Sequence, residues 1–95
     1  MIPESIQSRR GRVLISGPMF RDLDLMAEVF AGFAVFGLNH DVYRDSVEVY
    51  AAGAPFEEIS EGQVIPEYLC DMTRTDDGEL LLEWRRVMHG GVMGL

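Results

Sequence analysis

Three residues of the types used in nucleophilic catalysis are present: Cys70, His40 and Asp41. A thiol, an imidazole and a carboxylate can act as nucleophile, base and orienting group when a fold brings them together. Their spacing matches no such arrangement. Cys70 lies on the core side of a predicted strand, opposite Trp84 on the partner strand. A thiol in apolar surroundings is expected to be buried and unreactive. We therefore predict no catalytic residues and a protein that is not an enzyme.

Residues that could bind a metal ion are few. A site built from His40, Asp41 and His89 would require two separate loops to meet, and zinc sites need three or four ligands. Residues 22–24, Asp-Leu-Asp, begin like a calcium loop, but Met26 occupies the next ligand position and no glycine follows. No glycine-rich phosphate-binding loop opens a predicted helix. We therefore predict neither a metal nor a cofactor.

The composition describes a small acidic globular protein. The chain of 95 residues suffices for one domain and carries a formal net charge of −8 at pH 7. This charge disfavours direct binding to nucleic-acid phosphates. The longest apolar run, residues 29–38, is about half of what a membrane-spanning helix needs. We expect a cytoplasmic protein that does not bind membranes, and the one cysteine cannot form an internal disulfide.

A β-hairpin between residues 68–75 and 79–87 can be predicted in register. The three-residue loop 76–78, Asp-Asp-Gly, forms a type I turn followed by a left-handed glycine. It sets Met72 opposite Leu82, whereas a two-residue loop would mix apolar and charged side chains on both faces. The predicted core face carries Tyr68, Cys70, Met72, Leu80, Leu82 and Trp84. The other face retains Leu69, Leu81 and Val87, which predicts that it is also partly covered.

A helix is predicted from Asp22, a suitable N-cap, to Gly37, a suitable C-terminal cap. After Glu28 this segment is apolar on all sides, and such a helix must be buried on more than one side. One sheet covers only one side, so we expect the remainder to pack against a second copy of the chain. The alternative is a strand over residues 29–38, because Gly32 weakens a helix and valine and phenylalanine favour sheets.

The predicted oligomer interface comprises Phe30, Gly32, Phe33 and Phe36. These residues could instead form core or line a ligand pocket between the helix and the sheet. Gly32 would permit the close approach of a second helix or a ligand. The excess of apolar helix surface over the sheet that can cover it favours the interface, and hence a homodimer.

Two further strands are predicted. The first covers residues 12–16, and the second covers residues 42–52 after a turn at residues 39–41, Asn-His-Asp. Alternation along the second strand places one set of small apolar residues on a common face: Val47, Val49 and Ala51.

The predicted fold class is α+β, as a single domain over residues 1–95. Its element order is β-α-β-β-β, with one helix packed on a three- to four-stranded antiparallel sheet. Residues 1–10 are expected to form a flexible basic arm, and residues 89–95 a frayed tail.

An acidic group is formed by Glu57, Glu58 and Glu61. Its simplest interpretation is solvated surface, and its alternative is a contact surface for a basic protein partner. The leading hypothesis for function is therefore a small acidic, non-enzymatic, homodimeric module that binds another protein. The alternatives are an acidic inhibitor of a nucleic-acid-handling enzyme and a small-ligand binder with its pocket between helix and sheet.

Overall fold

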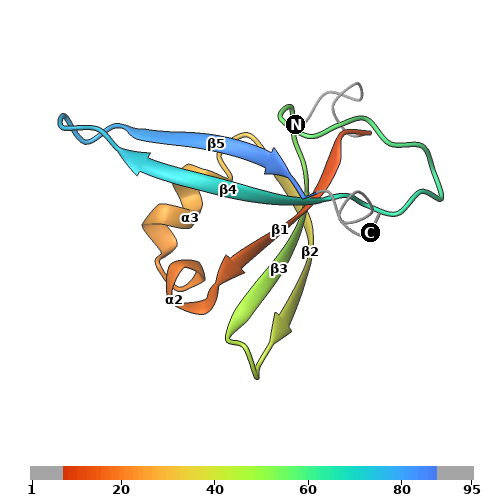
Figure 1. Cartoon of the computed structure of the whole chain (residues 1–95), viewed down its shortest axis with the longest axis horizontal. Coiled ribbons are helices and arrows are strands. Elements are labelled where there is room, and N and C mark those ends of the chain that lie inside the picture. Colours follow the sequence, from red (N-terminus) through yellow and green to blue (C-terminus); the bar gives the residue numbers. More distant parts are fainter. Residues whose placement is uncertain (1–7, 88–95) are drawn as a thin grey trace, which may run out of the picture.

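The computed structural model describes residues 8–87, which form one five-stranded sheet with two short helices (Figure 1). The strands lie in the order β2-β3-β1-β4-β5. Neighbouring strands are antiparallel except for β1 and β4, which are parallel. The elements are, in chain order, β1 (Arg10–Ser16), α2 (Gly17–Phe20), α3 (Leu23–Val29), β2 (Ala34–Asp41), β3 (Ser46–Ala52), β4 (Glu67–Arg74) and β5 (Leu80–Arg86).

The α+β class agrees with the prediction, but the predicted antiparallel sheet of three to four strands with one helix is wrong in detail. The sheet has five strands and is mixed, and two helices precede β2 in the described residues. The additional helix α2 follows directly from β1. Ser16 caps it by accepting a hydrogen bond from the N–H of Met19 at 3.4 Å. Pro18 stands in the first turn, where a helix needs no N–H donor.

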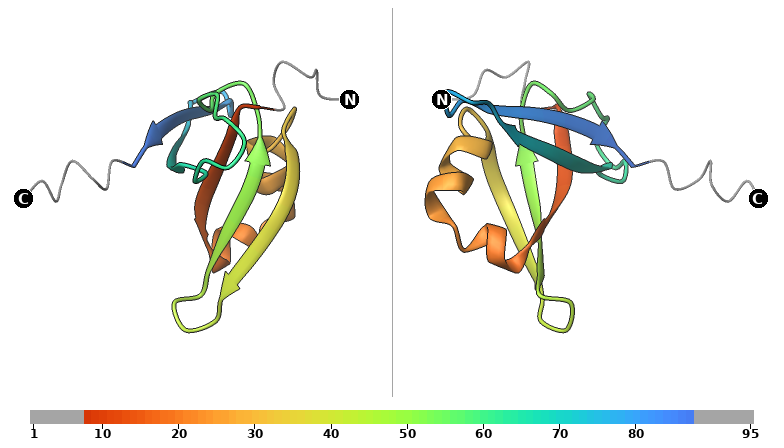
Figure 2. Two further views of the ribbon diagram at one scale, coloured as in Figure 1. Left: turned by 90° about the vertical axis from the view of Figure 1, so that its right-hand side faces the viewer. Right: turned by 60° about the vertical axis from the view of Figure 1, so that its left-hand side comes forward.

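The sheet divides into two hairpins that diverge from β1. Strands β1 and β4 pair at only two positions, Arg12 opposite Glu67 and Val13 opposite Tyr68. Beyond this junction the β4–β5 hairpin extends over the helices, while β2 and β3 continue alongside β1 (Figure 1). Both helices lie on one side of β1, β3 and β2 (Figure 2). We call the other side of these three strands the outer face.

Helix α3 begins as predicted and ends earlier. The side chain of Asp22 accepts a hydrogen bond at 3.1 Å from a backbone N–H of the first turn, so the predicted N-cap is confirmed. The helix ends at Val29 and not near Gly37, and Gly32 takes a φ of 81°, a conformation that suits glycine. The prediction of a helix is therefore wrong for the residues after Val29. The alternative prediction, a strand, holds from Ala34 onward.

The turn between β2 and β3 lies later than predicted. Residues 39–41 are the last three residues of β2, and the chain reverses over residues 42–45. Within this turn the carboxylate of Asp41 accepts hydrogen bonds from two backbone N–H groups at 3.1 and 3.2 Å. Asp45 has a φ of 49°, which aspartate tolerates better than most residues. The strand predicted over residues 42–52 therefore begins only at Ser46.

The β4–β5 hairpin has the predicted register. Cys70 lies opposite Trp84, and Gly78 takes the left-handed position with a φ of 88°. The alternation of inward and outward side chains follows the predicted core face. On the opposite face Leu69 and Leu81 are exposed and Val87 is partly buried, so among the described residues the partial cover predicted for that face is found only at Val87.

The core lies between the sheet and the helices. Phe56, from the loop between β3 and β4, sits at its centre with its ring 4.7 Å from that of Tyr68 and 5.4 Å from that of Trp84. The inward side chains of β1 and β3 complete it, and those of β3 are the ones predicted to share a face. The fully buried cluster comprises Val13, Ile15, Val47, Val49, Ala51, Phe56 and Tyr68.

The ends of the chain are described in part. Arg9 forms an isolated β-bridge with Glu58, and β1 begins at Arg10, so residues 8–10 of the predicted arm lie against the body of the protein. Residues 1–7 of that arm and the predicted tail over residues 89–95 lie outside the described residues. Neither helix of the described chain is long and apolar enough to cross a membrane.

Candidate interaction surface

Strand β2 forms one edge of the sheet, and within the described chain its outer side is not paired with a further strand. Edge strands present N–H and C=O groups that can bind another strand. The pairing of β2 with β3 is interrupted by a bulge between Val35 and Gly37. From Gly37 to Asp41 the pairing is regular. This run of β2 is therefore the part of the edge best shaped to accept another strand.

The apolar side chains that the fold leaves exposed are concentrated on β2 and its turn. Of the ten exposed large apolar residues among those described, five lie between residues 35 and 43. They are Val35, Phe36, Leu38, Val42 and Tyr43. Leu38 is 57% exposed, and Tyr43 is fully exposed. We call these five side chains, together with the backbone of β2, the β2 edge surface.

The opposite edge of the sheet, β5, is protected by charge. Its exposed residues include Glu83, Arg85 and Arg86. Arg85 donates a hydrogen bond of 2.7 Å to Asp71 on β4. Charged side chains along an edge oppose the addition of another strand. Strand β2 has no such protection, because its only carboxylate is that of Asp41 at the end of the strand, and it has no arginine.

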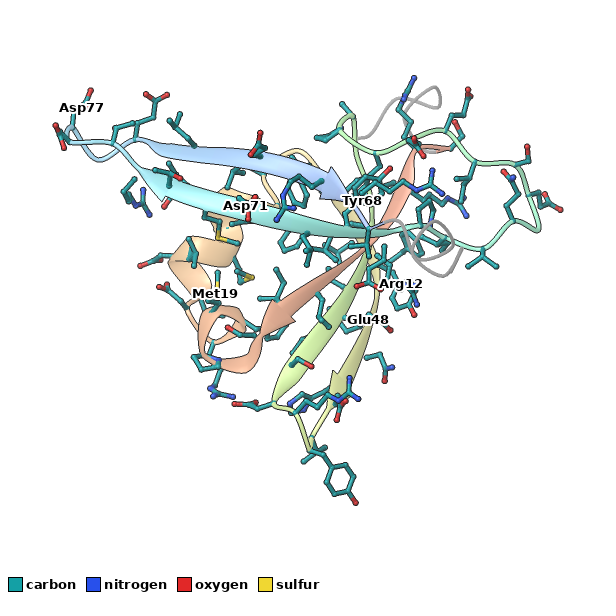
Figure 3. The ribbon with its side chains drawn as sticks, viewed as in Figure 1. Arg12, Met19, Glu48, Tyr68, Asp71 and Asp77 are labelled. Atoms are coloured by element: carbon teal, nitrogen blue, oxygen red, sulfur yellow. The ribbon has the colours of Figure 1, made fainter. Side chains whose placement is uncertain are left out.

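The outer face carries a polar network across three strands. The guanidinium of Arg12 lies 3.4 Å from the carboxylate of Glu48 (Figure 3). It also lies 3.6 Å from the carboxylate of Glu67. The hydroxyl of Tyr50 donates a 2.8 Å hydrogen bond to Glu48, and this bond is the main reason that the pKa of Tyr50 is raised. Beside this network, and reaching β2, is an open groove of about 360 Å³. It is lined by Leu14, Asn39, Asp41, Arg44, Ser46, Glu48 and Glu67.

Opposite charges lie near the two ends of β2. At its beginning, the ring of Phe36 lies 6.2 Å from that of Tyr50, and the guanidinium of Arg10 lies 5.5 Å from the centre of the Phe36 ring. At its end stands the carboxylate of Asp41, which lies 3.7 Å from the Nε of Arg44 in the same turn. Asp41 pairs with Ser46 in the register that also pairs Gly37 with Tyr50. Because side chains alternate along a strand, Asp41 lies on the same face of β2 as Gly37, beside Tyr50 of β3. The bulge places the ring of Phe36 on this face as well, against Tyr50.

The turn that carries the apolar tip is fixed to the helices. Arg21 donates two hydrogen bonds to the carboxylate of Asp45, at 3.0 and 3.2 Å, and the N–H of Gly17 donates to the Asp45 carbonyl at 2.6 Å. The hydrogen bond from Arg21 is the largest cause of the lowered pKa of Asp45. The Nε2 of His40 also lies 3.5 Å from this carboxylate. These contacts hold the turn in place while Tyr43 remains exposed.

The fold separates the four residues predicted as an interface or pocket. Phe30 and Phe33 pack against the core, with ring centres 6.3 and 5.2 Å from that of Trp84. Gly32 is exposed in the turn after α3. Phe36 lies on the outer face of β2 and alone among the four belongs to the β2 edge surface. The positions of Phe30 and Phe33 support a role in the core.

The predicted acidic partner surface lies in the loop between β3 and β4. Glu57 forms an ion pair with Arg86, and Glu58 accepts a hydrogen bond from the hydroxyl of Ser8 at 3.2 Å. Glu61 is exposed further along the loop. Part of the negative charge of this group is therefore matched within the chain, and its contact with a basic partner stays a prediction.

The residues considered for catalysis are far apart. Cys70 lies on β4, whereas His40 and Asp41 lie on β2, three strand spacings or about 14 Å away across the sheet. Burial, with a smaller contribution from Asp71, raises the pKa of the Cys70 thiol to about 11. Within residues 8–87 no three His, Cys, Asp or Glu side chains lie close enough together to hold a metal ion. His89 lies outside the described residues.

Sequence reasoning misses most of the β2 edge surface. The predicted interface includes Phe36 but not the other four side chains of this surface, which are Val35, Leu38, Val42 and Tyr43. A signal exists nonetheless, because residues 34–38 are apolar at odd and even positions alike and no Asp, Glu, Lys or Arg lies between Glu28 and Asp41. An edge strand that is exposed along much of its length would ordinarily carry polar residues.

Comparison of the chain with protein-family models, with curated proteins and with solved structures finds no match. The geometry of the β2 edge surface therefore has to carry the functional inference.

Proposed function

We propose that the protein is a small non-enzymatic binding module that contacts another protein chain through the β2 edge surface. One observation carries the proposal: an open sheet edge and half of the exposed large apolar residues of the described chain coincide on one strand and its turn. Exposed apolar patches on small proteins mark interaction sites. Open strand edges bind an added strand through main-chain hydrogen bonds, while neighbouring side chains provide specificity.

Strand addition accounts for the details of this surface. A strand laid along Gly37–Asp41 would bond to the outward N–H and C=O groups of β2 and would cover Leu38. Val42 and Tyr43 would extend the contact past the end of the strand. The hydrogen bonds between Arg21 and Asp45 hold this turn before binding, so little additional ordering of the turn is needed when a partner binds.

A non-enzymatic role is supported by the state and position of Cys70. Its raised pKa keeps the thiol protonated at neutral pH, and a protonated thiol is a poor nucleophile. Among residues 8–87 its distance from His40 separates it from the one histidine that could act as its base.

Photo-crosslinking in the native host tests the proposal. The amino acid p-benzoylphenylalanine is placed at Leu38 or, as a matched control, at Leu81, which is 48% exposed on the charged edge strand β5. We expect covalent protein adducts from position 38 and few or none from position 81. The absence of adducts at position 38, or equal adducts at both positions, would refute the β2 edge surface as the contact site.

A further inference from the structure

We infer that the chain bound at the β2 edge surface is a second copy of the protein, with its β2 antiparallel to the first across a two-fold axis. This inference rests on the proposed function and names the partner. The two sheets would join edge to edge into one continuous sheet. Both copies would use the same strand, as the self-complementary interface of a two-fold dimer requires.

The bulge in β2 selects the register. The regular run Gly37–Asp41 is centred on Asn39, so a two-fold axis at that residue places it opposite its own copy. Leu38 of one copy then lies opposite His40 of the other, and Gly37 lies opposite Asp41. Leu38 pairs with the inward-facing Val49 of β3, and Asn39 with Glu48 of the outer face. Each Leu38 therefore lies on the helix side of the joined sheet, where His40 of the other copy lies opposite and reduces its exposure.

Charge complementarity supports a second copy. In this register the carboxylate of Asp41 lies opposite Gly37 of the other copy, on the face where Phe36 and Arg10 lie. Because Gly37 has no side chain, space is left in front of Tyr50 for that carboxylate. The guanidinium of Arg10 is then a neighbour of the opposing Asp41. The two-fold axis produces this contact twice.

The distribution of acidic residues also favours pairing through β2. Two chains of net charge −8 repel each other, so they approach most easily where carboxylates are sparse. Strand β2 has no acidic residue before Asp41. The β4–β5 hairpin carries Asp76 and Asp77 at its tip and Glu83 on its edge strand, together with Arg85 and Arg86. Pairing through β2 therefore brings together a strand that carries only one carboxylate in each copy.

Sedimentation equilibrium of the purified full chain tests this inference. We expect a dimer for the unaltered protein at micromolar concentration. Leu38→Lys should raise the dissociation constant at least 100-fold, because two lysines would replace the covered leucines. The control Leu81→Lys should leave it unchanged. Asp41→Asn retains a side-chain acceptor for the turn but removes the charge opposite Arg10, and it should weaken the dimer several-fold with a smaller dependence on salt. Because Asp41 also lies 3.7 Å from Arg44 of its own chain, the control Arg44→Gln, which breaks only that internal pair, should leave the dissociation constant unchanged.

Amide hydrogen exchange on the unaltered protein provides a second test that needs no substitution. On dilution through the dissociation range, outward-facing amides of residues 37–41 should lose protection, while those of β5 should not change. A protein that remains monomeric at millimolar concentration, or a dimer that is insensitive to Leu38→Lys, or protection that changes on β5, would overturn the inference. A monomer that still gives crosslinks from position 38 to other proteins would overturn only the second copy as partner. The absence of any crosslink from that position would overturn the proposed function as well.

Discussion

Gly11 allows the central aromatic ring of the core to lie against β1, and the substitution Gly11→Ala tests this packing. A Cβ atom at this position would lie 2.8 Å from the Cγ and Cδ1 atoms of the Phe56 ring. The ring has little room to move, because Phe56 is only 1% exposed and contacts the rings of Phe33, Tyr68 and Trp84. We therefore expect the added methyl group to strain the centre of the core.

The expected loss of stability follows from two opposing effects. Overpacking a rigid core costs about 1–3 kcal/mol. Replacing glycine by alanine within a strand stabilises by about 0.5–1 kcal/mol when the backbone permits it. Gly11→Ala should therefore lower the free energy of unfolding by about 1 kcal/mol and by no more than about 2.5 kcal/mol, from a total on the order of 5–15 kcal/mol. Urea denaturation followed by the fluorescence of Trp84 measures this change.

The decisive comparison is made in the background Phe56→Leu, which costs about 1–2 kcal/mol by itself but removes most of the ring. In that background Gly11→Ala should be neutral or slightly stabilising, because the methyl group no longer meets ring atoms. The two substitutions should therefore couple by about 1 kcal/mol or more, beyond the ~0.5 kcal/mol within which independent sites add. If Gly11→Ala had the same effect in both backgrounds, the proposed contact between Gly11 and Phe56 would be wrong.

Two further predictions concern titrating groups. The pKa of Cys70 is about 11, against 9.0 for a free thiol, so less of it is thiolate at pH 8. Native protein at that pH should therefore react with iodoacetamide at least about tenfold more slowly than urea-unfolded protein, even though a more basic thiolate is the better nucleophile. Similar rates in both states would contradict the burial of Cys70. Hydrogen bonds from Arg21 and Arg85 lower the folded-state pKa values of Asp45 and Asp71. The two ion pairs therefore stabilise the fold fully above the unfolded-state pKa, near 4, and this contribution is lost as pH falls through the folded-state pKa values. The melting temperature should therefore decrease from pH 5 to pH 3, and a constant or rising value would show that these ion pairs do not stabilise the fold.

Local signals in the sequence predict the parts of this fold that depend on neighbouring residues. The loop of the β4–β5 hairpin is specified by Gly78, and only one register gives an apolar face, so Cys70 pairs with Trp84 as predicted. The N-cap of α3 is specified by Asp22. These features need no information about distant segments.

The parts that sequence reasoning misses depend on the environment of an apolar segment. The run from Val29 to Leu38 contains residues that suit a helix and residues that suit a strand, and its periodicity favours neither clearly. The structure resolves this ambiguity at Gly32, whose positive φ ends the helical segment, and by pairing Ala34 onward with β3. The parallel contact between β1 and β4 involves only two residue pairs, and so short a contact leaves little trace in the sequence.

The excess of apolar surface in this segment survives the change of its secondary structure. As a helix, the run would be too apolar for one sheet to cover. As the edge strand β2, it places Val35, Phe36 and Leu38 where neither described helix covers them. In both cases the apolar side chains present more surface than the rest of the described chain can cover. The expectation of a partner chain therefore comes from composition and burial, while the form of the contact, strand against strand instead of helix against helix, comes from the fold.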